Sequence, residues 1–400
     1  MNSKMLTGKT IVLGVTGGIA AYKSANLASM LVKLNADVHV IMTHNATHFI
    51  TPMTFETLTN NKCIVDTFDR NFSFDVKHVS LAKRGDLFVV APCTANVIGK
   101  LAHGICDDML TTTMLATKAP KLIAPAMNTG MWENPILQDN LLKLKGYGYH
   151  IIDPIIGRLA CGDTGTGKMN SEEVIVEHIL TFLAKEHDLK GKRFLITAGP
   201  TQEAIDPVRY ITNHSSGKMG YAIAKMARLR GAEATLVSGP VNIRPFEGVD
   251  VVPVVSAQDM FQAVTSRSSK ADVVIMCSAV ADYTPAVYSD QKVKKHDDEM
   301  AIQLTRTQDI LGWLGEHKSA NQTLVGFSME TENLIENSRA KLLKKHADLI
   351  CANSIAGGQT GFAVDTNKVT LITNETVTEL PLCSKEETAD KILDFIATLS

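Results

Sequence analysis

The chain has 400 residues, of which 45% are hydrophobic and 20% are charged, and its formal net charge is −2. This composition is typical of a globular protein and excludes a largely disordered one. The length suffices for two or three domains, each with a core of its own. Because the net charge is close to zero, we expect no nucleic-acid partner.

The seven cysteines are scattered along the chain and form no CxxC pair. An odd, scattered set argues against a disulfide framework or a zinc site and favours reduced thiols. No apolar run reaches the ~18 residues that a membrane span requires, and no signal-peptide pattern opens the chain. We therefore expect a cytoplasmic protein without a membrane partner.

The first half of the chain alternates strand and helix patterns. Such alternation indicates a parallel sheet covered by helices on both faces. Apolar runs predict strands at 10–16, 37–42, 86–91 and 121–124, and helical patterns occupy 20–34, 95–102, 108–116, 134–145 and 171–188.

The alternation restarts after a polar connector at 187–192, so we place a domain boundary near residue 190. The expected fold is α/β, with domains 1–190 and 191–400, the second of them Rossmann-like. A hairpin is expected around Asn374-Glu375. Further strands are predicted at 194–198, 234–237, 249–255, 272–277, 324–326 and 348–351, and helices at 221–230, 257–267 and 333–345.

Residues 199–220 form a polar, glycine-rich segment, GPTQEAIDPVRYITNHSSGKMG, between an apolar run and a helical pattern. A strand, a glycine-rich loop and a helix in this order place backbone N–H groups at the carboxyl edge of a sheet, where anions bind. The segment also holds more hydrogen-bond donors than a plain connector needs. Through TAGPT, the Asp-Pro-Val-Arg step and Asn-His-Ser-Ser-Gly-Lys-Met-Gly, it resembles the signature of phosphopantothenate–cysteine ligases.

Several segments of the first half follow predicted strands, where the ligands of α/β proteins gather. The first strand is followed by Gly17-Gly18, and the second ends in Thr43. A hydroxyl in place of an acid at that position favours a mononucleotide phosphate over the ribose of a dinucleotide. The next two strands lead into APCTAN at 91–96 and PAMN at 125–128.

Together with His78, these motifs resemble the flavin-dependent cysteine decarboxylase family over residues 5–185. The resemblance implies a flavoprotein-type parallel sheet, with His78 as catalytic base and Asn128 as ligand of the substrate carboxylate. Cys93 stands where that family usually has Ala or Ser. The implied FMN-binding residues are Gly17, Gly18, Thr43, Thr94, Ala95 and Asn96.

Residues 157–169, GRLACGDTGTGKM, look like a P-loop because Gly162-x4-Gly167-Lys168 has its spacing. We reject a P-loop, since Met169 replaces the Mg2+-binding Ser or Thr and no strand precedes it. The segment instead resembles the substrate flap of the decarboxylases, which implies that Cys161 is their catalytic cysteine. In the implied chemistry, flavin oxidises the CH2–SH group to a thioaldehyde, which accepts the electrons released on loss of CO2, and Cys161 protonates the resulting enethiolate.

The second half follows the ligase family in order across residues 191–400. The resemblance implies that Arg209 contacts the substrate and that Asn213 handles the acyl-nucleotide. Asp282 would hold Mg2+ on the triphosphate, and Lys292 would neutralise the charge that builds on the phosphates. Thr307-Gln308 precedes Asp309 where the family usually has Asn-Pro. The implied CTP site comprises Ala279, Asp282, Lys292, Asp309, Ile310, Phe327, Lys341 and Lys345.

As a whole, the sequence resembles the bifunctional coenzyme A biosynthesis family. This implies CTP-dependent ligation of 4′-phosphopantothenate to cysteine, followed by FMN-dependent decarboxylation of phosphopantothenoylcysteine to 4′-phosphopantetheine. It also implies a homo-oligomer, in which trimers of the flavin domain are joined through dimers of the ligase domain into a dodecamer. Two alternatives stay open: a flavin-binding regulatory protein fused to a ligase, and a nicotinamide oxidoreductase.

Overall fold

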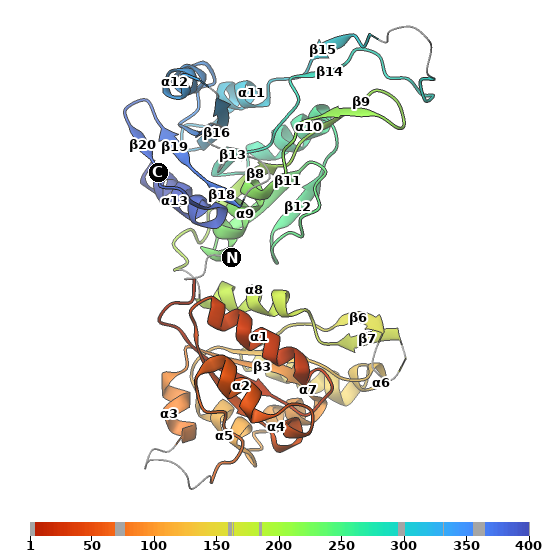
Figure 1. Ribbon diagram of the computed structural model, residues 1–400, viewed down its shortest axis with the longest axis vertical. Coiled ribbons are helices and arrows are strands. Elements are labelled where there is room, and N and C mark those ends of the chain that lie inside the picture. The colour runs from red at the N-terminus through yellow and green to blue at the C-terminus, as the bar shows by residue number, and fades with distance from the viewer. Residues whose placement is uncertain are drawn as a thin grey trace. The chain divides into compact units, whose positions relative to one another are not determined.

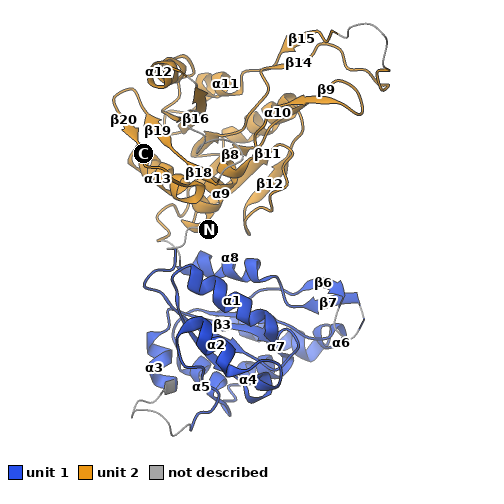
Figure 2. Ribbon diagram, in the orientation of Figure 1, with its two compact units in different colours: residues 1–185 blue, residues 186–400 orange. Residues whose placement is uncertain are grey.

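The computed structural model describes residues 5–68, 77–158, 162, 164–183, 186–294, 301–330, 332–354 and 365–399. The chain divides into two compact units, Met1–Lys185 and Glu186–Ser400 (Figure 2). Each unit is an α/β fold built on its own hydrophobic core. Among the helices of the described ranges, none is both long and apolar enough to cross a membrane.

The first unit is built on a five-stranded parallel sheet with the order β2-β1-β3-β4-β5. The chain winds from β1 to β2 on one side and then crosses to β3 on the other, so β1 and β3 form a topological switch point. The four strands predicted from apolar runs are confirmed. The strands are β1 (Thr10–Val15), β2 (Asp37–Met42), β3 (Leu87–Cys93), β4 (Lys121–Pro125) and β5 (Tyr149–Ile151).

Helices cover both faces of this sheet, as the sequence predicts (Figure 1). On one face α1 (Ala21–Lys33) and α8 (Glu172–Leu183) contact each other and β3. Helices on the opposite face share one core cluster with β1, β3 and β4. These are α3 (Lys77–Arg84), α4 (Ala95–His103), α5 (Met109–Ala116) and α7 (Pro135–Gly146), while η1 (His44–His48), α2 (Pro52–Thr59) and α6 (Thr129–Trp132) are short connecting elements.

The glycine-rich flap of the first unit is an antiparallel hairpin of β6 (Ile155–Arg158) and β7 (Thr164–Lys168). Lys168 lies within a strand, whereas a P-loop lysine opens a helix, so the rejection of a P-loop is confirmed. Cys161 falls between these two strands in the sequence and lies outside the described residues.

The second unit is built on an eight-stranded sheet with the order β12-β11-β8-β13-β16-β17-β19-β20. The first six strands are parallel, and in chain order they run 3-2-1-4-5-6, which confirms the expected Rossmann-like arrangement. The predicted hairpin is the antiparallel pair β19–β20. The strands are β8 (Arg193–Ala198), β11 (Glu233–Ser238), β12 (Asp250–Pro253), β13 (Val273–Met276), β16 (Thr323–Glu330), β17 (Leu349–Ser354), β19 (Val369–Ile372) and β20 (Val377–Glu379).

One face of the second sheet packs against α10 (Ala257–Ser268), α11 (Ile310–His317) and α12 (Leu334–Lys344). On the other face α9 (Lys218–Leu229) packs against β8 and α13 (Lys385–Leu399) (Figure 1). The sequence prediction omitted α13, although its pattern is readable. Its buried side chains at Ala389, Ile392, Leu393 and Ile396 follow the i, i+3, i+4, i+7 spacing of an amphipathic helix.

The segment 199–220 is not a simple loop, because it contains an antiparallel pair of β9 (Gln202–Ala204) and β10 (Tyr210–Thr212). Asp206 fixes the turn between them: its buried carboxylate accepts hydrogen bonds from the backbone N–H groups of Val208 and Arg209, both at 2.8 Å.

A second antiparallel pair, β14 (Tyr283–Pro285) with β15 (Leu304–Arg306), lies beside β9 (Figure 1). A short pair of β18 (Thr366–Asn367) and β21 (Cys383–Ser384) precedes α13.

The packing of α13 can be tested by fluorescence. Each unit holds one of the two tryptophans, Trp132 in the first and Trp313 in the second, so the unfolding of each unit can be followed separately. In a Trp132→Phe background, Trp313 fluorescence reports urea unfolding of the second unit alone. Ile392 is fully buried, so Ile392→Ala is expected to lower the free energy of unfolding by about 2–5 kcal/mol. The neighbouring exposed Lys391→Ala is the control and should stay within about 0.5 kcal/mol. Equal unfolding midpoints for the two variants would contradict the assigned packing.

Candidate functional site

The first unit contains a cavity of about 920 Å³ at the carboxyl ends of β1 to β4, where the sheet has its switch point. This is the place where doubly wound sheets bind ligands, and its volume lies in the range of small-molecule and cofactor sites. All six residues predicted to bind a cofactor line it, and so does Asn128. These cofactor candidates are Gly17, Gly18, Thr43, Thr94, Ala95 and Asn96.

Two features of this cavity fit an anionic group. The turn after β1 closes so tightly that a Cβ on Gly17 would lie 2.8 Å from the backbone carbon of Asn45. At the end of β2, the hydroxyl of Thr43 is buried and has no hydrogen-bond partner among the described residues. A buried hydroxyl without a partner lowers stability, so this position fits a ligand that carries a hydrogen-bonding group.

The opposite wall of the cavity comes from the segment after β4. Asn128 is the N-cap of α6, and its Oδ1 accepts a hydrogen bond of 2.8 Å from the backbone N–H of Gly130. The β6–β7 hairpin packs against the same segment, because Met127 N–H donates to the Gly167 carbonyl at 2.9 Å. A Cβ on Gly167 would lie 2.3 Å from the Met127 carbonyl oxygen, so only glycine permits this approach. The base of the flap is therefore fixed beside Asn128.

The two other catalytic candidates of the first unit, His78 and Cys161, are not among the described residues that line this cavity. His78 lies half-buried near the start of α3 and is not among the residues that line the cavity. Cys161 lies outside the described residues, between strands whose ends Arg158 and Lys168 do line the cavity.

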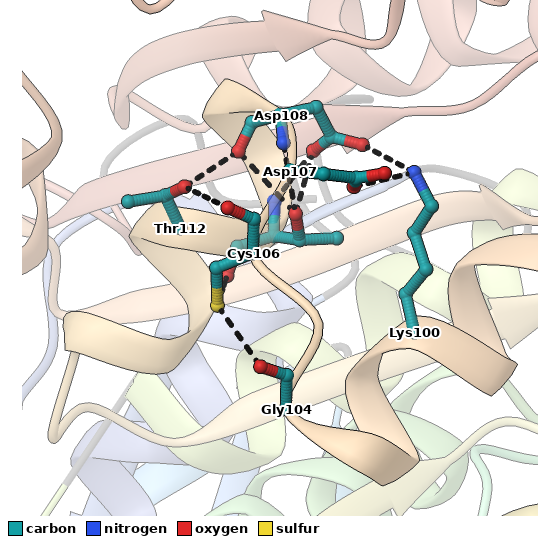
Figure 3. A network of polar contacts seen from close by, with 7 residues as sticks. Lys100, Gly104, Cys106, Asp107, Asp108 and Thr112 are labelled. Carbon is teal, nitrogen blue, oxygen red and sulfur yellow. Dashed lines mark hydrogen bonds and ion pairs between the residues drawn. The ribbon is translucent and has the colours of Figure 1, made fainter.

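The sequence prediction missed a charged network on the cavity wall, shown in Figure 3. The Lys100 ammonium lies 2.6 Å from an oxygen of Asp107 and 3.1 Å from one of Asp108. Burial opposes the charge, but hydrogen bonds to the two carboxylates raise the pKa of Lys100. Asp108 also caps α5 by accepting the Thr111 N–H at 2.8 Å. Because Lys100 stands one turn after Asn96 in α4, helical spacing was the signal that could have found it.

The second unit has a smaller cavity, of about 160 Å³, at the carboxyl ends of β13, β16 and β17 and the start of α9. Of the predicted ligase residues, Ala279 and Phe327 line it. Asn213 lies next to Ala279, since its side-chain amide donates to the Ala279 carbonyl at 3.1 Å. The cavity wall after β13 is held by the buried hydroxyl of Thr197, which accepts the N–H groups of Cys277 and Ser278, each at 3.0 Å.

Beyond Phe327, the structure brings five further predicted residues into one cluster. The Lys341 ammonium donates to the Phe327 carbonyl at 2.9 Å, and burial, the largest cause, lowers its pKa. The negative charge of Asp282 acts in the opposite direction and raises the pKa of the same ammonium. Lys345 forms an ion pair with Asp309, which caps α11 by accepting the Gly312 N–H at 3.0 Å. Ile310 opens that helix.

Arg209 and Lys292 lie elsewhere, in the region of the β9–β10 pair. Arg209 donates to the carboxylate of Asp206 at 2.6 Å and to the Val293 carbonyl at 2.8 Å, while the Val293 N–H donates to Asp206 at 3.1 Å. The Arg209 guanidinium, foremost among several donors, holds the pKa of Asp206 well below its usual range. The sequence prediction did not single out Asp206 as the partner of Arg209, although its Asp-Pro step signals a turn. Lys292, which precedes Val293 in the chain, is exposed.

The described residues contain no cluster of three or more His, Cys, Asp or Glu side chains that would hold a metal ion.

Comparison with known proteins finds a matching family for each unit. A family model described as Flavoprotein matches residues 1–184, and one described as DNA/pantothenate metabolism flavoprotein C-terminal domain matches residues 189–399. The coenzyme A biosynthesis bifunctional protein CoaBC of Bacillus subtilis (strain 168) is 47% identical over 400 residues, covering 99% of this chain and 98% of that protein. A cysteine/cysteine sulfinic acid decarboxylase from an unknown prokaryotic organism is 44% identical over 356 residues, with coverages of 88% and 99%.

Among solved structures, the crystal structure of the C-terminal domain of a coenzyme A biosynthesis bifunctional protein CoaBC is 48% identical. It covers 53% of this chain and 96% of that one, with a TM-score of 0.46. The near full-length identity and the two matching family models lead to one conclusion: the chain belongs to the family of bifunctional coenzyme A biosynthesis proteins.

Proposed function

We propose that the chain joins 4′-phosphopantothenate to cysteine in its 191–400 domain, using CTP, and decarboxylates the product to 4′-phosphopantetheine in its 1–190 domain, using FMN. The main support is the large cavity of the first unit, which has a buried, unpaired hydroxyl on one wall and Asn128 on the other. Such a cavity has room for a flavin and, beside it, the carboxylate end of a cysteine amide.

The residues around the cavity fit FMN. The Gly17-Gly18 turn and the Thr43 hydroxyl would hold its phosphate, because backbone N–H groups and a hydroxyl at the carboxyl edge of a sheet are phosphate ligands. The segment Thr94–Asn96, which opens α4, would contact the ring. When bound, the flavin supplies the removal and return of a hydride at the CH2–SH carbon, which no side chain here can do.

The remaining steps of the decarboxylation fall to side chains. Asn128 binds the substrate carboxylate through its amide, with an orientation that the cap on α6 fixes. His78 accepts the thiol proton, and Cys161 returns a proton to carbon after CO2 has left.

The position of His78 supports a homo-oligomer. Because the cavity of one chain is lined without His78, the His78 of a second copy would complete it. Ile19 and Tyr22 line the cavity and are 60% and 61% exposed, which is apolar surface suited to a contact between copies. Trimers through the flavin domain, joined into a dodecamer by ligase-domain dimers, would provide such contacts.

In the ligase domain, the carboxylate of phosphopantothenate attacks the α-phosphate of CTP and pyrophosphate leaves. Lys292 would neutralise the charge that builds on the phosphates, and Asp282 would hold Mg2+, which would offset part of that charge. The amine of cysteine then attacks the acyl carbon and CMP leaves, with the amide of Asn213 beside the reacting carbon and Arg209 on the substrate. The contact of Asn213 with the Ala279 carbonyl supports its place at the nucleotide.

The complete activity is tested by incubating the full chain with phosphopantothenate, cysteine, Mg2+ and either CTP or ATP, and following products by mass. We expect 4′-phosphopantetheine with CTP. In Cys161→Ser we expect about one decarboxylated enethiol per flavin, after which phosphopantothenoylcysteine accumulates because the flavin stays reduced. Accumulation in the wild-type chain instead would favour a regulatory flavin domain. Decarboxylation of free cysteine, with no ligation, would favour the activity named for the second relative.

The role of Thr43 predicts a selective loss of affinity for the flavin phosphate. Thr43→Val keeps the side-chain shape and removes one charge-assisted hydrogen bond, so the Kd for FMN should rise about 10- to 100-fold. The Kd for riboflavin, which lacks the phosphate, should not change. Thr47→Val, a threonine outside the cavity, is the control. An equal loss for FMN and riboflavin, measured by flavin fluorescence quenching, would refute the assignment.

Sharing of sites between copies is tested by complementation. Asn128→Asp keeps the cap acceptor but repels the substrate carboxylate, and His78→Asn removes the base, so each variant alone should be inactive. Oligomers co-expressed from both genes in equal amounts should regain about a quarter of the wild-type decarboxylation rate if His78 and Asn128 come from different copies. No recovery in mixed oligomers that retain FMN would show that one copy supplies both residues.

A further inference from the structure

Two segments of the predicted nucleotide site in the second unit are connected through Thr307. The first is the segment 279–282, which follows β13 and carries Ala279 and Asp282. The second begins at Asp309, the N-cap of α11, two residues after Thr307 in the chain. Thr307 itself is not one of the residues assigned to the nucleotide.

Thr307 makes two hydrogen bonds to the first of these segments. Its backbone N–H donates to the Asp282 carbonyl at 3.0 Å, which extends the antiparallel pairing of β14 and β15 by one residue pair. Its hydroxyl reaches one residue further and donates to the Ala281 carbonyl at 2.6 Å. The side chain of Thr307 therefore keeps hold of the segment at the point where the chain turns away into α11.

Ala281 is held by threonine hydroxyls on both of its backbone groups. The residue is only 7% exposed, so its N–H and carbonyl both need partners. The N–H donates to the hydroxyl of the fully buried Thr201 at 3.0 Å, and the carbonyl accepts from Thr307. Without the Thr307 hydroxyl, the Ala281 carbonyl would lose this partner, and the segment would gain a reason to shift.

The residue that follows Thr307 makes its side chain more important in this chain. Residue 308 is Gln, where the family usually has Pro. A proline would restrict the preceding residue to extended conformations by covalent constraint alone. With Gln308 that constraint is missing, and the two hydrogen bonds of Thr307 limit the conformations of the backbone instead.

The second segment is fixed from a different direction. Asp309 caps α11 and forms an ion pair with Lys345, the C-cap residue of α12. Its position is therefore set by two helices, whereas the Asp282 backbone is bonded to Thr307. The distance between the carboxylates of Asp282 and Asp309, which both belong to the predicted nucleotide site, thus depends on the contacts of Thr307.

We propose that Thr307 is a positioning residue for the nucleotide: through the Ala281 carbonyl it keeps the segment 279–282 in the orientation that binds CTP. Thr307 acts through Ala279 and Asp282 and makes no contact of its own with the nucleotide. The inference rests on the proposed ligase function, because it assumes that this region of the second unit is the nucleotide site.

The proposal is tested by isothermal titration of the full chain with CTP and Mg2+, without phosphopantothenate or cysteine. Thr307→Val keeps the shape of the side chain and removes one hydrogen bond to a buried carbonyl, so the Kd for CTP should rise about 10-fold. Thr307→Ser keeps the hydroxyl and should bind CTP nearly as wild type. Thr305→Val, at an exposed threonine two positions earlier on β15, is the matched control and should not differ from wild type.

Steady-state ligation rates separate positioning from a general loss of structure. A positioning role predicts that Thr307→Val raises the KM for CTP by a similar factor and leaves the KM for cysteine unchanged. Partial unfolding would lower kcat and leave both KM values unchanged, because it reduces only the amount of active chain. A loss in kcat alone would therefore overturn the proposal. So would wild-type CTP affinity in folded Thr307→Val, an equal loss in Thr305→Val, or no recovery in Thr307→Ser.

Binding of CTP needs no turnover, so the titration is separate from the test of ligation. If the wild-type chain binds CTP more tightly than Thr307→Val but makes no phosphopantothenoylcysteine, the positioning role stands and the proposed ligase function fails. If the chain ligates normally and Thr307→Val binds CTP as wild type does, the function stands and the positioning role fails.

Discussion

Both units depend on the same constraint: a buried threonine at the end of the first strand ties together the two strands of the switch point. In the first unit, the Thr16 hydroxyl donates to the Pro92 carbonyl at 2.8 Å and accepts the Thr94 N–H at 3.0 Å. In the second, Thr197 accepts two backbone N–H groups of the segment after β13. Both threonines are fully buried. Strands diverge at a switch point, so some of their backbone groups have no hydrogen-bond partner on a neighbouring strand. Each threonine hydroxyl is the partner of such groups. The crevice beside it stays open for a ligand.

The two crevices differ in size because different segments fill them. In the first unit a short glycine turn leads directly into α1, and the β6–β7 hairpin bounds a large open space. In the second, the segment after β8 folds back closely, since a Cβ on Gly239 would lie 1.8 Å from the Pro200 carbonyl oxygen. α9 approaches the sheet so closely that a Cβ on Gly220 would lie 2.6 Å from the Ala198 Cβ. This packing leaves the smaller cavity, of about 160 Å³.

The sequence predicted the strands and most helices because buried parallel strands are continuous apolar runs and the helices between them are amphipathic. It did not predict the pairs β6–β7, β9–β10 and β14–β15, whose residues are polar or glycine-rich and whose pairing is set by contacts with the rest of the unit. The predicted cofactor residues follow consecutive parallel strands, so sheet topology alone gathers them at one edge. His78 follows no strand, and periodicity therefore could not show that α3 holds it away from the cavity lining. Asp206 and Lys100 were missed because their importance lies in contacts between segments.

The charges of the two sites suit the two halves of the proposed reaction sequence. Ligation builds negative charge on phosphates, and several lysines of the second unit lie in the predicted nucleotide region or beside it. Lys218 and Lys385 line its cavity, while Lys341 and Lys345 contact Phe327 and Asp309. Decarboxylation removes negative charge from the substrate carboxylate, which leaves as neutral CO2. A cation bound to that carboxylate would stabilise the ground state more than the transition state and slow the reaction. If Asn128 is the carboxylate ligand, as we propose, its uncharged amide avoids this penalty. The charge of Lys100, which lines the same cavity, is offset by its pairing with Asp107 and Asp108.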